Sequence, residues 1–337
     1  MNFDIIAYGT QGALIYHSLP PQIKDNFCKA FNRLFSAGVE IPAAWLEGIS
    51  NAQKTSNDAQ IQLIKAVGYK TAQSVTLPDQ YVEAVTLKSF KRIFGEQLNL
   101  DSVLSNTPAQ LKGLLDQTSG SHGSEKKEIS DDWLNTFEKA AGEKSSEEMR
   151  LLFSKVLAGE IIRPGTYSIR AIQILSSLET EVAKLFQLFC SCSVALKFEG
   201  KYFDVRVCGL NGQASQNSLA SFGLSFQNLN LLLEYGLIIS DFNSQHTYGQ
   251  NAFVPRFSIF PFYYRNQFST ILEKDTNISP PEFNIRGVSL TKCGRELFPI
   301  IDQVDASHYK IAFEAYLSGL NKKLEVIPKM DLYGPLL

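Results

Sequence analysis

A run of short amphipathic helices between residues 129 and 198 constrains the fold of this chain most. Ser130 can cap the first helix, and apolar residues follow it at helical spacing. Ser145 and Glu148 form a capping box that predicts the start of the second helix, and Gly159 marks its expected end. Because the connections between these helices are short, the pattern predicts a compact helical bundle. The residues expected to face inward are Trp133, Leu134, Phe137, Ala141, Met149, Leu152, Phe153, Val156, Ile169, Ile172, Leu175, Leu178, Val182, Leu185, Phe186 and Phe189.

The region before this block also has helical patterning. One helix is expected over residues 23–35 and another after Pro78. Between them, residues 42–75 are rich in Ala, Gln, Asn and Ser, and the apolar stripe of this stretch is narrow. Such a helix buries little surface alone, so we expect it to pair with copies of itself or, alternatively, to fold back on its own domain. The residues assigned to self-association are Trp45, Ile49, Leu63 and Val67.

Residues 117–128 consist mainly of Gly, Ser and charged residues, a composition typical of a flexible linker. This segment and the end of the helical block divide the chain. The predicted parts are an N-terminal helical region with a long polar helix (1–116), the linker (117–128), the helical bundle (129–198) and a winged-helix-like α+β domain (199–337).

From residue 201 the apolar period changes from that of helices to that of strands. The predicted fold class is therefore mainly α with a C-terminal α+β part. Thr291 can cap a short helix that ends at Leu297. The other elements expected here are strands at 202–207, 237–239, 253–264, 286–290 and 324–327, and helices at 219–235 and 308–320.

Two segments of this last domain look like parts of a winged helix. Residues 229–238 match the end of a recognition helix that leads into a strand, and residues 290–297 match the strand-to-helix step after the wing. Between Ser218 and Gly236 there is no Lys or Arg, and Glu234 is the only charged residue. A recognition helix without cations cannot neutralise phosphates, which supply most of the affinity for DNA. The sequence therefore favours a winged helix that binds proteins.

Composition agrees with an ordinary globular protein. The chain has 337 residues, with 34 acidic and 32 basic residues and a net charge of −2, so it carries no excess of positive charge for nucleic acid. Five cysteines without framework spacing argue against a disulfide-rich secreted protein. No stretch is apolar enough to span a membrane, and the N-terminus does not resemble a signal peptide. We expect a cytoplasmic protein.

Sequence motifs for catalysis or cofactor binding are missing. There is no phosphate-binding loop, no dinucleotide-binding glycine pattern and no nucleophile elbow. Cys190 and Cys192 are two residues apart within an expected helix, where they point to different sides, and the histidines are isolated. We therefore predict no catalytic residue, no metal site and no cofactor, although a site could still assemble from distant residues.

The turn between the second and third helices of the block is the best candidate for a polar site. Backbone amides at a helix N-terminus attract anions, and two arginines flank this turn. The alternative is structural: a hydroxyl caps the helix, and Glu160 pairs with an arginine to fix the turn. The candidate anion-binding residues are Arg163, Gly165, Thr166, Ser168 and Arg170.

The same block carries a family resemblance. Asp132-Trp133, Ser146–Met149, Leu157–Glu160, Pro164-Gly165 and Ser168–Arg170 resemble the signature of a bacterial family catalogued as domain of unknown function 2806. The resemblance is specific over 129–196 and extends over 219–300. It implies no particular chemistry. The block also looks like the helical part of Abi-alpha-type abortive-infection proteins, which implies a role in defence against phage.

Together these observations predict a non-enzymatic protein-interaction or oligomerising component, which the second resemblance connects with anti-phage defence. We expect partners to be proteins and copies of the chain itself, with no specific nucleic acid and no membrane span. The alternatives are a winged-helix DNA-binding regulator and an enzyme whose site assembles only in three dimensions. Self-association would support the interaction component, sequence-specific DNA binding would support the regulator, and a pocket of ionisable groups would support the enzyme.

Overall fold

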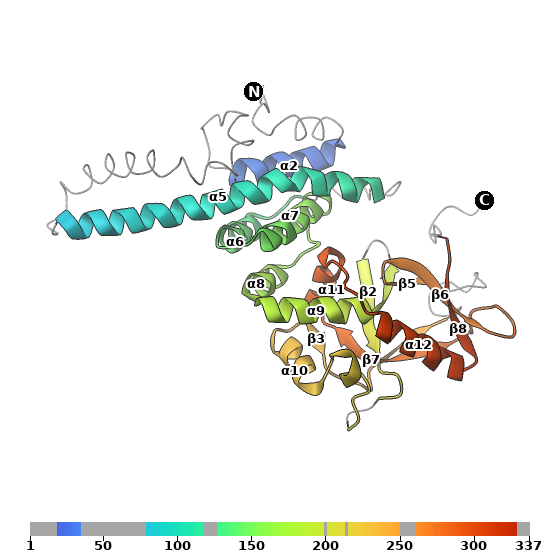
Figure 1. The fold of residues 1–337 in the computed structure, drawn as a ribbon. Coiled ribbons are helices and arrows are strands. Elements are labelled where there is room, and N and C mark those ends of the chain that lie inside the picture. Colours follow the sequence, from blue (N-terminus) through green and yellow to red (C-terminus); the bar gives the residue numbers. More distant parts are fainter. Residues whose placement is uncertain are drawn as a thin grey trace. The chain divides into compact units, whose positions relative to one another are not determined.

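The computed structural model describes residues 19–34, 79–117, 127–198, 201–212, 215–249, 261–328. The chain divides into two compact units, Met1–Ser176 and Ser177–Leu337 (Figure 1). The boundary between the two units lies after Ser176, whereas the predicted boundary lies after residue 198. Most of the predicted linker lies outside the described residues. The predicted domain bounds therefore stay a prediction.

The first unit is helical. Its described elements are α2 (Pro21–Leu34), α5 (Asp79–Gln117), α6 (Asp131–Gly142), α7 (Glu147–Ile162) and most of α8 (Ile169–Ser177). The long helix α5 packs on α6 and α7, and its N-terminal half extends beyond them (Figure 1). Aromatic side chains fill the core, where the Phe137 ring lies 5.0 Å from Trp133 and 5.5 Å from Phe153.

Of the two predicted helix caps in this unit, one is at the predicted residue and the other is one residue later. The Ser130 hydroxyl accepts from the amide of Trp133, as predicted. At the next helix the cap is Ser146, which accepts from Met149, and not Ser145; both residues have the right chemistry, and the structure uses the second. This helix also continues past Gly159 to Ile162. Ile169 was expected to face inward but is exposed at the start of α8.

The second unit combines helices with an antiparallel sheet. The strands are β1 (Val194–Phe198), β2 (Lys201–Cys208), β3 (Ile238–Ile239), β4 (Gln245–Tyr248), β5 (Pro261–Tyr264), β6 (Gln267–Glu273), β7 (Phe283–Leu290) and β8 (Lys322–Val326). The helices are α9 (Thr180–Cys192), α10 (Phe226–Glu234), α11 (Lys292–Leu297) and α12 (Ser307–Gly319), with short 3-10 turns η2 (Ala220–Phe222) and η3 (Phe298–Ile300). The strand order is β3-β7-β2-β1-β5-β6-β8, and β4 also pairs with β7.

One corner of this unit places α10 against the sheet. Ile238 of β3 pairs with Leu290 of β7, which pairs with β2 on its other side. The Thr291 hydroxyl accepts from the Gly294 amide, so it caps α11 as predicted. The helix expected over 219–235 is broken into η2 and α10, because Gly223 has a φ of 82° and Ser225 caps a new helix.

The mainly helical chain with antiparallel strands in its C-terminal half confirms the predicted fold class at this level. The predicted strand 253–264 is described only over Pro261–Tyr264. Within the described part of the chain, no helix is long and apolar enough to cross a membrane.

Candidate functional site

The turn predicted to bind anions is built around the buried carboxylate of Glu160. The amide of Gly165 donates to one carboxylate oxygen at 2.6 Å, and the amides of Thr166 and Tyr167 donate to the other at 3.1 Å each. Gly165 has a φ of 84°, which lets the chain curl around the carboxylate. An external anion would have to displace Glu160 to reach these amides.

The other polar groups of this turn also have partners. The Thr166 hydroxyl donates to the Arg163 carbonyl at 2.6 Å, and the Ser168 hydroxyl accepts from the amide of Ala171 at 3.2 Å. The Trp133 indole donates to the Tyr167 carbonyl at 2.8 Å. Glu160 binds backbone amides, and Ser168 caps α8, so the turn stabilises the fold of the first unit. Arg163 and Arg170 are exposed beside it, and their anion-binding role stays a prediction.

We expect Glu160→Ala to lower the free energy of unfolding by about 2–4 kcal/mol, because it leaves the buried amide of Tyr167 and the part-buried amides of Gly165 and Thr166 without their acceptor, and an unsatisfied buried group costs ~1–3 kcal/mol. Urea unfolding followed by circular dichroism measures this loss. The control is Glu148→Ala, which removes an exposed carboxylate from the first turn of α7. Equal stability of the two variants would contradict the structural role of Glu160.

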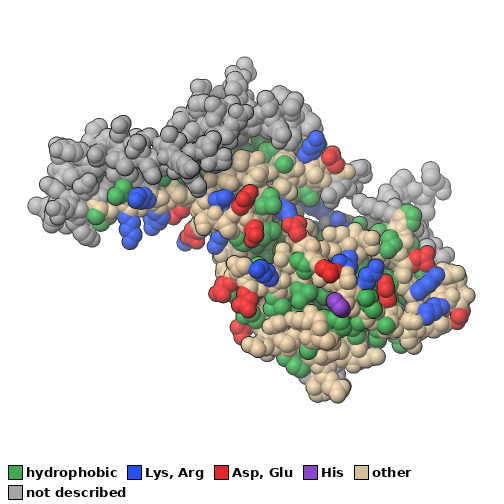
Figure 2. Space-filling view, viewed as in Figure 1, with side chains coloured by type: hydrophobic (Ala, Val, Ile, Leu, Met, Phe, Trp, Pro, Cys, Tyr) green, Lys and Arg blue, Asp and Glu red, His purple; other side chains and the backbone are tan. Residues whose placement is uncertain are grey.

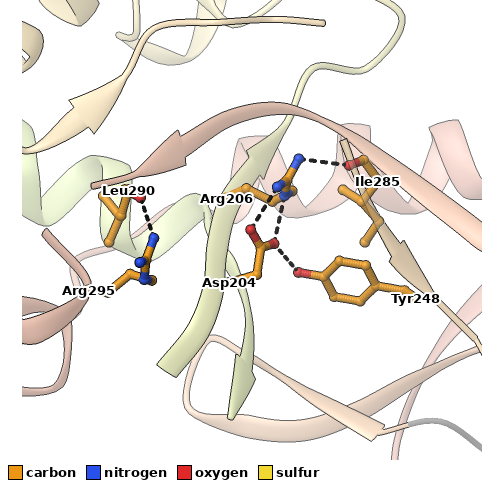
Figure 3. A network of polar contacts seen from close by, with 6 residues as sticks. All are labelled: Asp204, Arg206, Tyr248, Ile285, Leu290 and Arg295. Carbon is orange, nitrogen blue, oxygen red and sulfur yellow. Dashed lines mark hydrogen bonds and ion pairs between the residues drawn. The ribbon is translucent and has the colours of Figure 1, made fainter. Parts of the chain in front are cut away.

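The densest buried polar network lies in the second unit, around Asp204 and Arg206 of β2 (Figure 3). Arg206 donates to both Asp204 oxygens at 2.6 and 2.7 Å and to the carbonyl of Ile285 at 3.2 Å. The Tyr248 hydroxyl donates to Asp204 at 2.9 Å. Desolvation opposes the charge of Arg206, but the hydrogen bonds and charge of Asp204 outweigh it and raise the pKa of Arg206. These groups satisfy one another, so the network holds β2, β4 and β7 together.

Sequence reasoning missed this network. Asp204 and Arg206 are two apart in a strand and therefore share one side of it, a signal that was available. Their partner Tyr248 is 44 residues away, and nothing local points to it. His246, whose ring lies 5.9 Å from that of Tyr248, is half-buried, and desolvation lowers its pKa.

The outer face of α10 is the most distinctive exposed surface of the second unit. Leu229 and Leu232 are buried, whereas Phe226 and Leu233, at the border of the buried side, are 40% and 45% exposed. Ile239 of β3, which follows the helix, is 48% exposed. Figure 2 shows hydrophobic side chains at the surface in this region. We call the side chains of Phe226, Gln227, Asn230, Leu233, Glu234 and Ile239 the α10 face.

One edge of the α10 face is acidic. Tyr235, directly after α10, lies close to Glu179 and Glu234, and desolvation followed by these two carboxylates raises the pKa of Tyr235. Both carboxylates are exposed, and α10 itself contains no Lys or Arg. The α10 face thus combines large apolar side chains with negative charge, a combination suited to a protein partner and unsuited to phosphates.

The remaining predicted sites fall elsewhere. Trp45, Ile49, Leu63 and Val67 lie outside the described residues. Among the residues that are described, no group of three His, Cys, Asp or Glu side chains could hold a metal ion. Burial raises the pKa of the Cys208 thiol to about 11, and that of Cys192 to about 12, so neither is a ready nucleophile.

Comparison with known proteins identifies the family. The model of the family described as "Protein of unknown function (DUF2806)" matches residues 91–314, more than half of the chain. The chain belongs to this family. The DUF2806 match begins within α5 and ends within α12, so it includes the Glu160 turn, the Asp204–Arg206 network and the α10 face. No curated protein and no solved structure matches the chain.

Proposed function

We propose that this member of the DUF2806 family is a non-enzymatic component that acts by binding proteins, including other copies of itself. The α10 face carries the proposal, because it exposes Phe226, Leu233 and Ile239 in one region without any cation on the helix. Exposed apolar side chains gathered in this way are typical of protein-binding surfaces. The closed hydrogen bonding of Asp204 and Arg206 supports a structural use of these buried charges.

We also propose that this corner of the second unit is a winged-helix module. The supporting features are the strand order β2-β7-β3, the short turn η2 before α10, and the step from β7 into the capped helix α11. In helix-turn-helix modules the recognition helix, which α10 would correspond to here, makes the main contacts with DNA. The compact bundle is proposed on the same terms for the part of residues 129–198 that lies in the first unit, from the short connections between α6, α7 and α8.

Self-association is proposed to involve the stretch 42–75, whose narrow apolar stripe gains too little burial alone. The variant Trp45→Glu with Leu63→Glu places two charges in this stripe. We expect light scattering to report a smaller particle, while the thermal melt followed by circular dichroism stays unchanged. An unchanged particle size would contradict the assignment of these residues, and an altered melt with unchanged size would assign them to folding of the single chain.

The second candidate is a DNA-binding regulator, which the β2-β7-β3 arrangement also supports. Because α10 lacks cations, we expect affinity for duplex DNA at physiological salt to be nonspecific, with Kd no tighter than about 10⁻⁶ M. Fluorescence anisotropy with duplexes of several sequences measures this. Sequence-selective nanomolar binding would replace the protein-binding proposal with the DNA-binding one.

A role in anti-phage defence, in the cytoplasm, is part of the proposal and rests on the resemblance to Abi-alpha-type proteins. The five cysteines without disulfides are consistent with a reducing compartment. Phage plating on bacteria that express the chain tests this role. We expect fewer plaques with the wild type than with a Leu233→Lys variant of equal abundance, and equal plaque numbers on both would contradict it.

A further inference from the structure

The N-terminal half of α5 presents a surface of opposite character to the α10 face. From Ala84 to Gly95 the helix has three cations, Lys88, Lys91 and Arg92, and no acidic residue. Val85 and Ile93 are 45% and 56% exposed, and Lys88 and Lys91 are exposed as well. Figure 2 shows hydrophobic and basic side chains together at the surface of this part of α5. We call these residues the α5 face.

The apolar and charged side chains of the α5 face lie side by side. Val85, Lys88 and Arg92 share one side of the helix at spacings of three and seven residues, and Lys91 and Ile93 flank this side on its two borders. Arg92 has a partner on its own helix, because its side chain lies 3.6 Å from that of Glu96. Lys88 and Lys91 are therefore the cations best placed to meet a carboxylate from outside.

The two faces match in charge and in spacing. On α10, Phe226 and Leu233 are seven residues apart, or about 10.5 Å along a helix; on α5, Val85 and Ile93 are eight apart, or about 12 Å. Val85 can pack beside Phe226 and Leu233 when the helices lie together, and Ile93, about 80° further around α5, lies at the border of the contact. The acidic edge with Glu179 and Glu234 then lies against the basic edge that carries Lys88 and Lys91.

We propose that the α10 face of one copy binds the α5 face of a second copy of this chain. This inference rests on the proposed function, self-association, and names the surfaces that carry it. Because the two surfaces differ, each copy can bind one neighbour through its α10 face and another through its α5 face. These contacts are in addition to those of the stretch 42–75. Charge complementarity of this kind fixes the partner and the register of an interface.

Charge reversal tests the contact. Glu234→Lys is expected to weaken self-association measured by sedimentation velocity by about tenfold or more, because like charges then face each other across the interface. Lys88→Glu with Lys91→Glu should have a similar effect. A chain that carries all three changes should recover affinity to within about threefold of the wild type, since attraction is restored with opposite signs. The control is Glu282→Lys, an equal charge change before β7 that should leave association unchanged.

Zero-length carbodiimide cross-linking of a mixture of ¹⁴N- and ¹⁵N-labelled wild-type protein tests the contact directly. The expected product joins Glu234 of one isotope to Lys88 or Lys91 of the other. An oligomeric wild type that lacks this mixed-isotope product, and whose association is unaffected by Glu234→Lys, would overturn the inference while leaving the proposed function in place. A wild type that is monomeric at every concentration would overturn both.

Discussion

Replacing Arg206 with methionine is expected to lower the free energy of unfolding by about 3–5 kcal/mol, because it leaves the carboxylate of Asp204 buried without its countercharge. Tyr248 alone cannot compensate, since its single hydroxyl reaches one of the two carboxylate oxygens. Chemical unfolding monitored by circular dichroism measures the loss.

The matched control removes the whole network at once. A variant with Asp204→Leu, Arg206→Met and Tyr248→Phe buries no unpaired charge, so we expect its stability to lie within about 2 kcal/mol of the wild type. A single Arg206→Met variant as stable as the triple variant would contradict the account of this network as a closed, mutually satisfied group.

Gly287→Ala is expected to lower the free energy of unfolding by about 3 kcal/mol or more, from backbone strain of ~1–3 kcal/mol together with steric overlap of similar size. Gly287 has a φ of 149°, and a Cβ atom there would collide with the carbonyl of Val207 and approach the Gly209 nitrogen at 2.7 Å. The residue lies where β7 pairs with β2, so the substitution loosens the part of the sheet that supports α10.

Gly113→Ala is the control for this substitution. Gly113 lies in α5 with nothing within 4 Å of the place where a Cβ would stand, so alanine there is expected to stabilise the helix by up to about 1 kcal/mol. Thermal unfolding of both variants checks the contrast. A Gly287→Ala variant that melts with the wild type would show that the β2–β7 junction can relax around a side chain.

The sequence was most informative where structure depends on neighbouring residues. Ser130 and Thr291 could be assigned as caps because a cap needs only the next three residues. The second helix of the block showed the limit of this reasoning, since Ser145 and Ser146 have the same chemistry and only the path of the chain selects Ser146.

Strands were predicted less well than helices. Residues 194–198, in β1, directly follow α9 with continued apolar character, so their buried positions do not alternate with polar ones. Strand β4 contains only polar and aromatic residues and forms because it pairs with β7, nearly forty residues later. Pairing over such separations leaves no local pattern in the sequence.

For the α10 face and the Glu160 turn, too, only the part that depends on neighbouring residues could be predicted. The absence of cations in α10 was visible in the sequence, but the exposure of Phe226 and Leu233 depends on which side of the helix the sheet covers. In the Glu160 turn, the sequence left the choice between an anion-binding and a structural role open. In the structure, the carboxylate of Glu160 accepts hydrogen bonds from the amides of this turn.

The central claim is that this chain acts through association with other copies, and the mass of the wild-type protein in solution tests it most directly. Light scattering coupled to size-exclusion chromatography, over a concentration range from about 1 to 100 µM at physiological salt, is expected to report a mass at least twice the 37.6 kDa of one chain. Raising the salt concentration should shift the mass towards that of a single chain, because the proposed contact between the α5 and α10 faces includes exposed charges. A mass of 37.6 kDa at all these concentrations would contradict the account.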